Sequence, residues 1–353
     1  MMNPAPLFTV VVSAHQTEPW LPKALASVAG QSFPDFECIL YVEESTDASL
    51  AIARAAADRA PRFSVVSAPK SGACATTRNY AIDHARGRYL VILDGDDWLA
   101  PDALARLAEK LDATGPVDVL AFAALATPDE NAPPERTERL ANFSPADASS
   151  VVSGPDALRR AVRGGAQFRN FVWLSAYRLD FLRATGLRQS DGVLMEDLGW
   201  TPRVWFAADR VACLDAVLYT YRRRPGSLTT EASPRILFDL VVQIRSLLDF
   251  VFSRPVPPDL LAVWANQWMA NLYWFLFHPV TSRKIPDSDR RQALRRLFAP
   301  PGGEQLRRLA ARASLPRRLA FPLLRLAALG VQFPAKLFFR RLYYPLVARR
   351  SSR

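Results

Sequence analysis

Three carboxylates follow one short apolar run within four positions. The run 89–93 is predicted to be a buried strand, and Asp94, Gly95, Asp96 and Asp97 come directly after it. Packing acids this closely costs Coulombic energy unless a cation resolves it. Oxygen ligands select Mg²⁺ or Mn²⁺, and such an ion at the end of a strand can clamp a diphosphate. Asp and Gly also favour a simple turn, so the motif alone leaves both interpretations open.

Three further segments carry residues that could do chemistry. Glu196 and Asp197 lie in an apolar, aromatic stretch, where a carboxylate can be tuned for proton abstraction, or where two acids simply open a helix. The acids of segment 43–47 could accept hydrogen bonds from a base or ribose, although Asp47 also suits a helix N-cap. Arg78 could supply a cation beside the acids, or be a solvated helix residue.

The elements that must position these residues follow a regular spacing. Short β-rich runs begin about every 26–28 residues, and helical patterns lie between them. The spacing predicts an α/β fold with a mostly parallel sheet, in which ligands bind at the carboxyl ends of the strands. Residues 124–165 are predicted to be a loop or irregular insert, and the chain from about residue 232 onward to be helical, with a break at 301–303. The predicted strands are 8–13, 36–42, 63–67, 89–93 and 117–122.

Composition limits the class of protein. The chain has 353 residues, of which 50% are hydrophobic and 22% charged, so a largely disordered or fibrous protein is excluded. Three cysteines and three histidines are too few for a disulfide framework or a zinc cluster. The sequence has no dinucleotide-binding glycine motif, no P-loop, no zinc-protease motif and no hydrolase nucleophile elbow.

The excess of positive over negative charge is confined to the end of the chain. Residues 301–353 hold twelve Lys and Arg and one acid, so they account for the whole net charge of +11. Segment 314–350 mixes cations with Phe, Leu and Tyr, which suits a helix in a membrane interface, divided by prolines into short pieces. The alternative is a helical cap packed on the rest of the protein. No apolar run is long enough to span a bilayer, and no signal peptide is recognised. The expected location is cytoplasmic, peripheral on the inner face of the membrane.

The order and spacing of these motifs resembles the family 2 glycosyltransferases of the GT-A fold, of the bacterial surface-polysaccharide type. The resemblance covers residues 7–231. It is carried by segments 11–21 and 27–33, by Glu43–Asp47 in place of Asp-Gly-Ser-x-Asp, by Arg78-Asn79, by Asp94–Trp98 as the Asp-x-Asp-Asp motif, by Glu196-Asp197, and by segment 219–229, which is similar to Tyr-Arg-x-Arg-x-x-Ser-x-Thr.

The resemblance implies a hexosyltransferase that moves a sugar from a nucleotide-sugar, expected to be a UDP-sugar, to an acceptor hydroxyl with inversion. It implies Asp197 as the general base with Glu196 in support, and a divalent cation on Asp94 and Asp96. The implied nucleotide-sugar ligands are Ser13, His15, Glu18, Glu43, Arg78, Asp94, Gly95 and Asp96, and the implied acceptor-side residues are Asp97, Trp98 and Trp200.

The implied organisation has three parts. Residues 1–231 form a GT-A domain, with a nucleotide-sugar half (1–123) and an acceptor and base half (124–231). A helical extension (232–300) and the basic tail (301–353) follow. The expected partners are the donor, a glycan or lipid-linked acceptor and an anionic membrane surface, with no nucleic acid. Two alternatives stay open: a catalytically inactive glycosyltransferase-like binding protein, and a nucleotidyltransferase.

Overall fold

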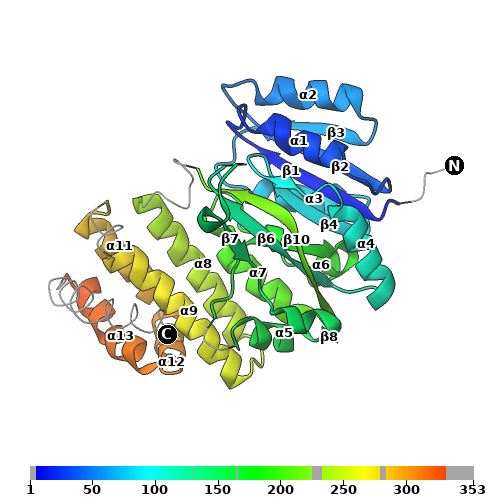
Figure 1. Ribbon diagram of the computed structural model, residues 1–353. Helices are drawn as coiled ribbons and strands as arrows, with labels where there is room; N and C mark the ends of the chain where they lie inside the picture. The colour runs from blue at the N-terminus through cyan, green and yellow to red at the C-terminus, as the bar shows by residue number, and fades with distance from the viewer. Residues whose placement is uncertain (1–4, 130, 164–165, 225–232, 279–283, 331–353) are drawn as a thin grey trace. The chain divides into compact units, whose positions relative to one another are not determined.

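A mixed sheet of ten strands is the centre of the N-terminal part of the chain. The computed structural model describes residues 5–129, 131–163, 166–224, 233–278 and 284–330 (Figure 1), in two compact units, Met1–Arg224 and Pro225–Arg353. The strand order is β3-β2-β1-β4-β9-β6-β10-β5, with β7 paired to β6 and β8 to β10. The strands are β1 Phe8–Ala14, β2 Phe36–Glu43, β3 Phe63–Ala68, β4 Tyr89–Asp94, β5 Trp98–Leu99, β6 Val119–Thr127, β7 Glu138–Leu140, β8 Val151–Val152, β9 Ser175–Arg178 and β10 Val211–Arg222.

Parallel pairing brings the ends of distant strands to one edge. β1 pairs in parallel with β2 and β4, and β10 with β6, whereas β9 runs antiparallel between β4 and β6. The central strands are buried along nearly their whole length, which explains their continuous apolar sequences. The helices that flank this sheet are α1 Leu21–Ala29, α2 Ser49–Arg59, α3 Ala75–His84, α4 Ala103–Thr114, α5 Gly154–Ala161, α6 Leu179–Thr185 and α7 Glu196–Ala207.

The prediction of an irregular insert at 124–165 is wrong. β6 continues to Thr127, β7, β8 and α5 follow, and two short 3₁₀ turns (η1 Pro134–Arg136, η2 Pro145–Ser149) connect them. Val152 of β8 pairs with Val211 of β10, a partner far away in the sequence. A Cβ on Gly154 would lie 1.7 Å from the carbonyl oxygen of Trp205, so only glycine lets α5 begin this close to α7. Strand pairing between residues so far apart in the sequence, like that of β8 with β10, produces no periodic pattern in the local sequence.

The C-terminal unit is helical in its described residues, as the sequence predicts. Its helices are α8 Pro234–Phe252, α9 Pro258–Phe277, α11 Asp287–Phe298, α12 Gly302–Ala310 and α13 Leu315–Ala328. The expected break near 301–303 is present, because α11 ends at Phe298 and α12 begins at Gly302. Gly302 packs against the end of α11, where a Cβ would lie 2.7 Å from the carbonyl oxygen of Leu297. Pro322 does not divide α13. Residues 331–353 of the basic tail lie outside the described residues.

Within the described parts of the chain, no helix combines the length and the apolar character needed to cross a membrane.

Candidate active site

The carboxyl end of β4 is held in register with the end of β1. Ser13 lies opposite Asp94, and its Oγ donates a hydrogen bond of 3.0 Å to Asp94 Oδ1. The backbone N–H of Gly95 donates to the carbonyl oxygen of Ser13 at 2.8 Å. A Cβ at position 95 would approach that oxygen to 2.7 Å, so the glycine is required by the close approach of two chains. The predicted donor residues Ser13, Asp94 and Gly95 therefore meet at one point.

Asp96 faces an arginine that follows β10. The Nε of Arg224 donates to Asp96 Oδ2 at 2.7 Å, and the guanidinium lies 4.3 Å from the centre of the Trp20 ring. Burial, and then the charge of Asp94, raise the pKa of Asp96, although the bond from Arg224 opposes this. Two carboxylates that repel each other in this way are a place where a cation would be stabilising.

Asp97 differs from its neighbour because its side chain is 1% exposed and is bonded inside the protein. Its oxygens accept hydrogen bonds from the Tyr219 hydroxyl at 2.5 Å and from the Arg222 backbone N–H at 2.7 Å. Burial, followed by the charges of Asp96 and Asp94, raises the pKa of Asp97 well above its ordinary value. The residue fastens β10 to the end of β4, and the acceptor-side role implied for it stays a prediction.

Arg78 connects the two acid motifs. It lies on α3, is buried, and donates 3.3 Å to Asp94 Oδ1 through Nη2 while Nη1 bonds the carboxylate of Glu196. Burial alone would lower the pKa of this guanidinium, but Asp94 and Glu196 offset that effect and raise it. Its Nε is buried without a hydrogen-bond partner in the described structure. Arg78 thus contacts one acid, Glu196, that lies 118 positions away from it in the sequence.

The acid pair Glu196-Asp197 opens α7. Met195, just before it, has the left-handed backbone of φ 60° and ψ 30°, which is uncommon for a residue other than glycine and is concentrated at functional sites. Asp197 is partly buried and accepts a hydrogen bond from the Leu198 N–H at 2.7 Å. Burial, and then the charge of Glu196, raise the pKa of Asp197 to about 7, while Arg78 opposes the rise. A carboxylate in this range can act as a base near neutral pH.

The loops after β1 and β2 are tied to each other. Gln16 has a φ of 53°, and its N–H donates to Ser45 Oγ at 3.1 Å. The N–H of Glu18 donates to Asp47 at 2.9 Å, and Glu18 in turn accepts from the N–H of Ala48 at 2.9 Å. His15 Nδ1 lies 3.4 Å from the same Ser45 Oγ. Glu18 and Asp47 thus each accept a hydrogen bond from a backbone N–H of the other loop. Binding of the sugar donor by His15 and Glu18 stays a prediction.

Glu43 lies at the end of β2 and is already bonded within the unit. Its side chain is buried and accepts from the Ser71 N–H at 3.2 Å and from the Ser71 hydroxyl. Contact with a nucleotide at this position would have to displace Ser71 or use the backbone. The role in nucleotide binding implied for Glu43 is untested.

The two tryptophans named for the acceptor side lie in different environments. Trp98 is partly exposed, with Lys23 Nζ 3.9 Å and the Arg222 guanidinium 4.8 Å from its ring centre. Trp200 is 0% exposed, and its Nε1 donates to the carbonyl oxygen of Leu187 at 3.2 Å. A contact of Trp200 with an acceptor would require this part of the core to open, because the ring has no exposed surface.

Sequence reasoning missed three positioning residues. Tyr219 and Arg224 belong to the quoted segment 219–229, but their contacts to Asp97 and Asp96 require β10 to end beside β4. Gln189 has no motif at all; its carbonyl oxygen accepts from Asn79 Nδ2 at 3.0 Å and its side chain lies 3.4 Å from Arg78. The left-handed backbone at Met195 also has no sequence signal.

The fit of a divalent cation depends on Asp94 and Asp96. In the described ranges, no group of three or more His, Cys, Asp or Glu side chains is placed to hold a metal ion. Mg²⁺ in proteins is commonly held by one or two carboxylates together with substrate phosphates and water. The two aspartates fit that pattern, because both offer carboxylate oxygens and because burial, and then the charge of Asp94, raise the pKa of Asp96.

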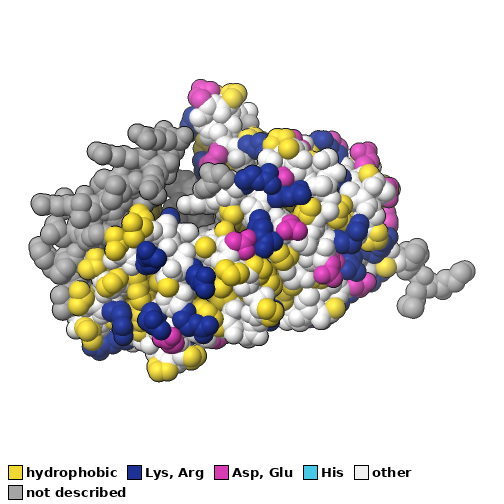
Figure 2. All heavy atoms as spheres, turned by 90° about the horizontal axis from the view of Figure 1, so that it is seen from below, with side chains coloured by type: hydrophobic (Ala, Val, Ile, Leu, Met, Phe, Trp, Pro, Cys, Tyr) yellow, Lys and Arg dark blue, Asp and Glu magenta, His cyan; other side chains and the backbone are white. Residues whose placement is uncertain are grey.

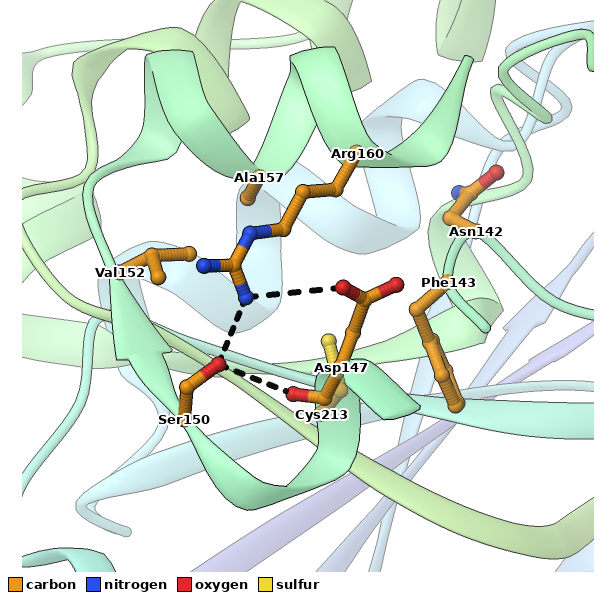
Figure 3. Close-up of a pocket in the computed structure, with 8 residues that line it drawn as sticks. All are labelled: Asn142, Phe143, Asp147, Ser150, Val152, Ala157, Arg160 and Cys213. Atoms are coloured by element: carbon orange, nitrogen blue, oxygen red, sulfur yellow. Dashed lines mark hydrogen bonds and ion pairs between the residues drawn. The ribbon is translucent and has the colours of Figure 1, made fainter. Parts of the chain in front are cut away.

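A small cavity lies at the opposite end of β10 and is separate from this site (Figure 3). Arg160 reaches across it to Ser150 Oγ at 2.6 Å and to Asp147 Oδ1 at 3.5 Å. Burial raises the pKa of the Cys213 thiol to about 12, so this cysteine stays protonated. The space suits about one water molecule. It is lined by Asn142, Phe143, Asp147, Ser150, Val152, Ala157, Arg160 and Cys213.

Comparison with known proteins identifies the family. The sequence model of the protein family "Glycosyl transferase family 2" matches residues 9–164. The N-terminal unit of this chain belongs to glycosyl transferase family 2. The match includes the β4 motif and Arg78, whereas Glu196 and Asp197 lie beyond it.

Relatives agree with this family 2 assignment, and solved structures share the fold. The uncharacterized glycosyltransferase EpsJ of Bacillus subtilis is 29% identical over 227 residues, which are 64% of this chain and 63% of EpsJ. The succinoglycan biosynthesis protein ExoO of Rhizobium meliloti is 33% identical over 119 residues, 32% of this chain and 34% of ExoO. This chain therefore spans slightly less than two thirds of the first of these relatives. S. aureus TarS 1–349 in complex with UDP-GlcNAc has a TM-score of 0.72 at 19% identity, covering 95% of this chain and 91% of that one. The predicted GT-A fold with C-terminal helices is confirmed.

Proposed function

We propose that this chain transfers a sugar from a nucleotide-sugar to a hydroxyl group of a glycan or lipid-linked acceptor, with inversion at the anomeric carbon. The observation that carries the proposal is the double contact of Arg78. It brings Asp94, at the end of β4, and Glu196, at the start of α7, to the same guanidinium. Asp197 is the next residue, so a donor site and a base are assembled around one buried cation.

The reaction needs one base and one stabilised leaving group. The acceptor oxygen attacks the anomeric carbon, the carbon–oxygen bond to the diphosphate breaks, and its electron pair leaves with the nucleoside diphosphate. The acceptor proton passes to the Asp197 carboxylate. General-base assistance is worth about 10²–10⁴-fold. Direct attack with a single base inverts the configuration.

Asp94 and Asp96 would hold the divalent cation. When bound, such an ion supplies charge stabilisation to the departing diphosphate. Arg224 pairs with Asp96 and lies within the same group of charges, so its guanidinium could also face the phosphates. Ser13 and Gly95 fix the position of Asp94, which keeps the oxygen donors oriented before the donor arrives.

The comparisons suggest which substrates to test first. TarS was crystallised with UDP-GlcNAc, so a UDP-sugar is the donor we propose. ExoO is named for succinoglycan biosynthesis, which supports a polysaccharide or its lipid-linked precursor as the acceptor class. A cytoplasmic protein on the inner face of the membrane fits such an acceptor. We retain residues 1–123 and 124–231 as the proposed donor and acceptor halves.

A thermal-shift screen of nucleotide-sugars, with Mn²⁺ or with EDTA, tests this function. A ligand that binds only the native state raises the melting temperature. We expect a shift with a UDP-sugar and Mn²⁺ that EDTA removes, followed by release of UDP when donor and Mn²⁺ are incubated together. A shift without any turnover, even with glycan acceptors, would favour the inactive binding protein. A shift with nucleoside triphosphates alone would favour the nucleotidyltransferase.

A further inference from the structure

Helix α13 has an exposed row of leucines. Leu315, Leu319 and Leu326 lie on the helix and Leu329 is its C-cap; these residues are 57%, 61%, 39% and 75% exposed. With about 100° between successive residues of a helix, these four positions fall within an arc of about 80°. We call this row the leucine face. A soluble helix normally turns such a row toward the core, and a clustered exposed one marks an interaction surface.

The opposite side of α13 is fastened to its own unit. Leu324 and Ala327 are 0% exposed. Where the helix begins, the Ser314 N–H donates to Asn266 Oδ1 at 2.8 Å, and the Tyr273 hydroxyl donates to the carbonyl oxygen of Arg317 at 2.8 Å. Both partners lie on α9. The leucine face is therefore held outward by packing and hydrogen bonds on the other side.

Arginines line one edge of the leucine face. Arg318 and Arg325 are exposed and seven positions apart, so they lie on the same side of the row. Neither forms an ion pair with an acid in the described part of the chain. Over residues 301–330 there are six arginines and one acid, Glu304. Figure 2 shows hydrophobic side chains beside Lys and Arg on the side of the C-terminal helices.

We propose that the leucine face of α13, with its edge arginines, binds an anionic lipid surface. A helix with leucines on one side and arginines beside them lies in the plane of the interface, with the leucines in the acyl boundary and the cations at the headgroups. Each Lys or Arg near an anionic surface contributes about 1 kcal/mol, a factor of about five in affinity. A second copy of this chain would bring like charges together, so charge complementarity favours the lipid. The inference is independent of glycosyl transfer.

The test is co-sedimentation of the full chain with vesicles, without donor or metal. The vesicles are phosphatidylcholine alone, or equal parts phosphatidylcholine and phosphatidylglycerol. We expect binding to the anionic vesicles, little to the neutral ones, and a loss of affinity as salt is raised. Leu319→Gln with Leu326→Gln should weaken binding at least about tenfold. Arg318→Gln with Arg325→Gln should weaken it about fivefold for each charge.

Val242→Gln is the matched control, because Val242 is 45% exposed on α8 and outside the leucine face. It should bind like the unchanged chain. Circular dichroism and melting temperature establish that each variant is folded, since substitutions on the surface usually change stability little.

Three outcomes would overturn the proposal. The first is equal vesicle binding by the leucine variant and the unchanged chain. The second is a clear fall in melting temperature of the leucine variant with vesicle binding unaltered, which would mean that another segment of the chain, such as 331–353, covers the face. The third is that the unchanged chain does not bind vesicles but forms a dimer, and that the leucine substitutions dissociate this dimer.

Discussion

The end of β4 and the start of α7 each carry adjacent acids, but their surroundings differ. At the end of β4, Asp97 is bonded to Tyr219 and Arg222 and Asp96 to Arg224. At the start of α7, Glu196 takes the contact with Arg78, while the pKa of Asp197 is raised to about 7 by burial and by Glu196.

The difference shows how partners separate residues of the same type. A carboxylate bonded to a buried hydroxyl and a backbone N–H fastens two strands, as Asp97 does. The pKa values of Asp97 and Asp197 are both raised, by burial and then by a neighbouring acid, so the pKa does not separate them. Asp197 is the candidate base because it is partly exposed at the start of α7, whereas the oxygens of Asp97 are buried in contacts with β10. Asp96 lies between these cases, since it is partly exposed and its arginine partner follows the end of a strand.

Asp197→Asn should have the largest effect on catalysis. An amide cannot take the acceptor proton, so turnover should fall about 10²–10⁴-fold, while donor affinity changes little. Turnover is measured by UDP release and donor affinity by calorimetry. Asp180→Asn is the control, because Asp180 is an exposed acid in the first turn of α6 and outside the site. If donor affinity falls and the rate survives, the base lies elsewhere.

Asp96→Asn should act on the donor instead. With one of two proposed metal ligands removed, binding of UDP that depends on Mn²⁺ should weaken at least about tenfold. Calorimetry with and without EDTA measures it. The fold should persist, because the pair with Arg224 is partly exposed and such pairs contribute about 0–1 kcal/mol. Normal turnover of this variant in EDTA would contradict a metal-dependent reaction.

Asp97→Asn should act chiefly on stability. The Asn amide group would face either the Tyr219 hydroxyl or the Arg222 N–H, both of which donate to position 97. Leaving one buried donor unsatisfied costs about 1–3 kcal/mol. Urea unfolding of this variant beside Asp96→Asn measures the contrast between the two neighbours. Equal stability of the two variants would show that Asp97 does not fasten β10.

The smallest effect is a shift in the pH profile. Because the pKa of Asp197 is about 7, the rate should rise as pH increases through 7, where the carboxylate loses its proton. Glu196→Gln removes the like charge that raises this pKa and frees Arg78, so the rise should move to lower pH. The raised pKa also means that the folded state holds an extra proton between about pH 4 and 7. Stability from this group therefore declines as pH increases across that range. If Glu196→Gln leaves the pH profile of the rate unchanged, the group that titrates in this profile is not Asp197.

The sequence by itself determined the parallel strand ends, the fold class and the motifs that identify the family. The continuous apolar runs of β1, β2 and β4 are typical of strands buried on both faces, and Asp94 follows such a run directly. The helical character of the C-terminal unit was also local information, because it depends on a period of 3.6 residues.

Only the tertiary structure decided which acid has which surroundings. The contact of Arg78 with Glu196 spans 118 positions, and that of Tyr219 with Asp97 spans 122. Neither leaves a trace in local spacing, because the first joins α3 to the start of α7 and the second joins β10 to the segment after β4. For the same reason the sequence wrongly predicts an irregular insert at 124–165, because β8 forms only by pairing with the distant strand β10. The outward direction of the leucine face was likewise decided by hydrogen bonds from α9, which hold the other side of α13 inward.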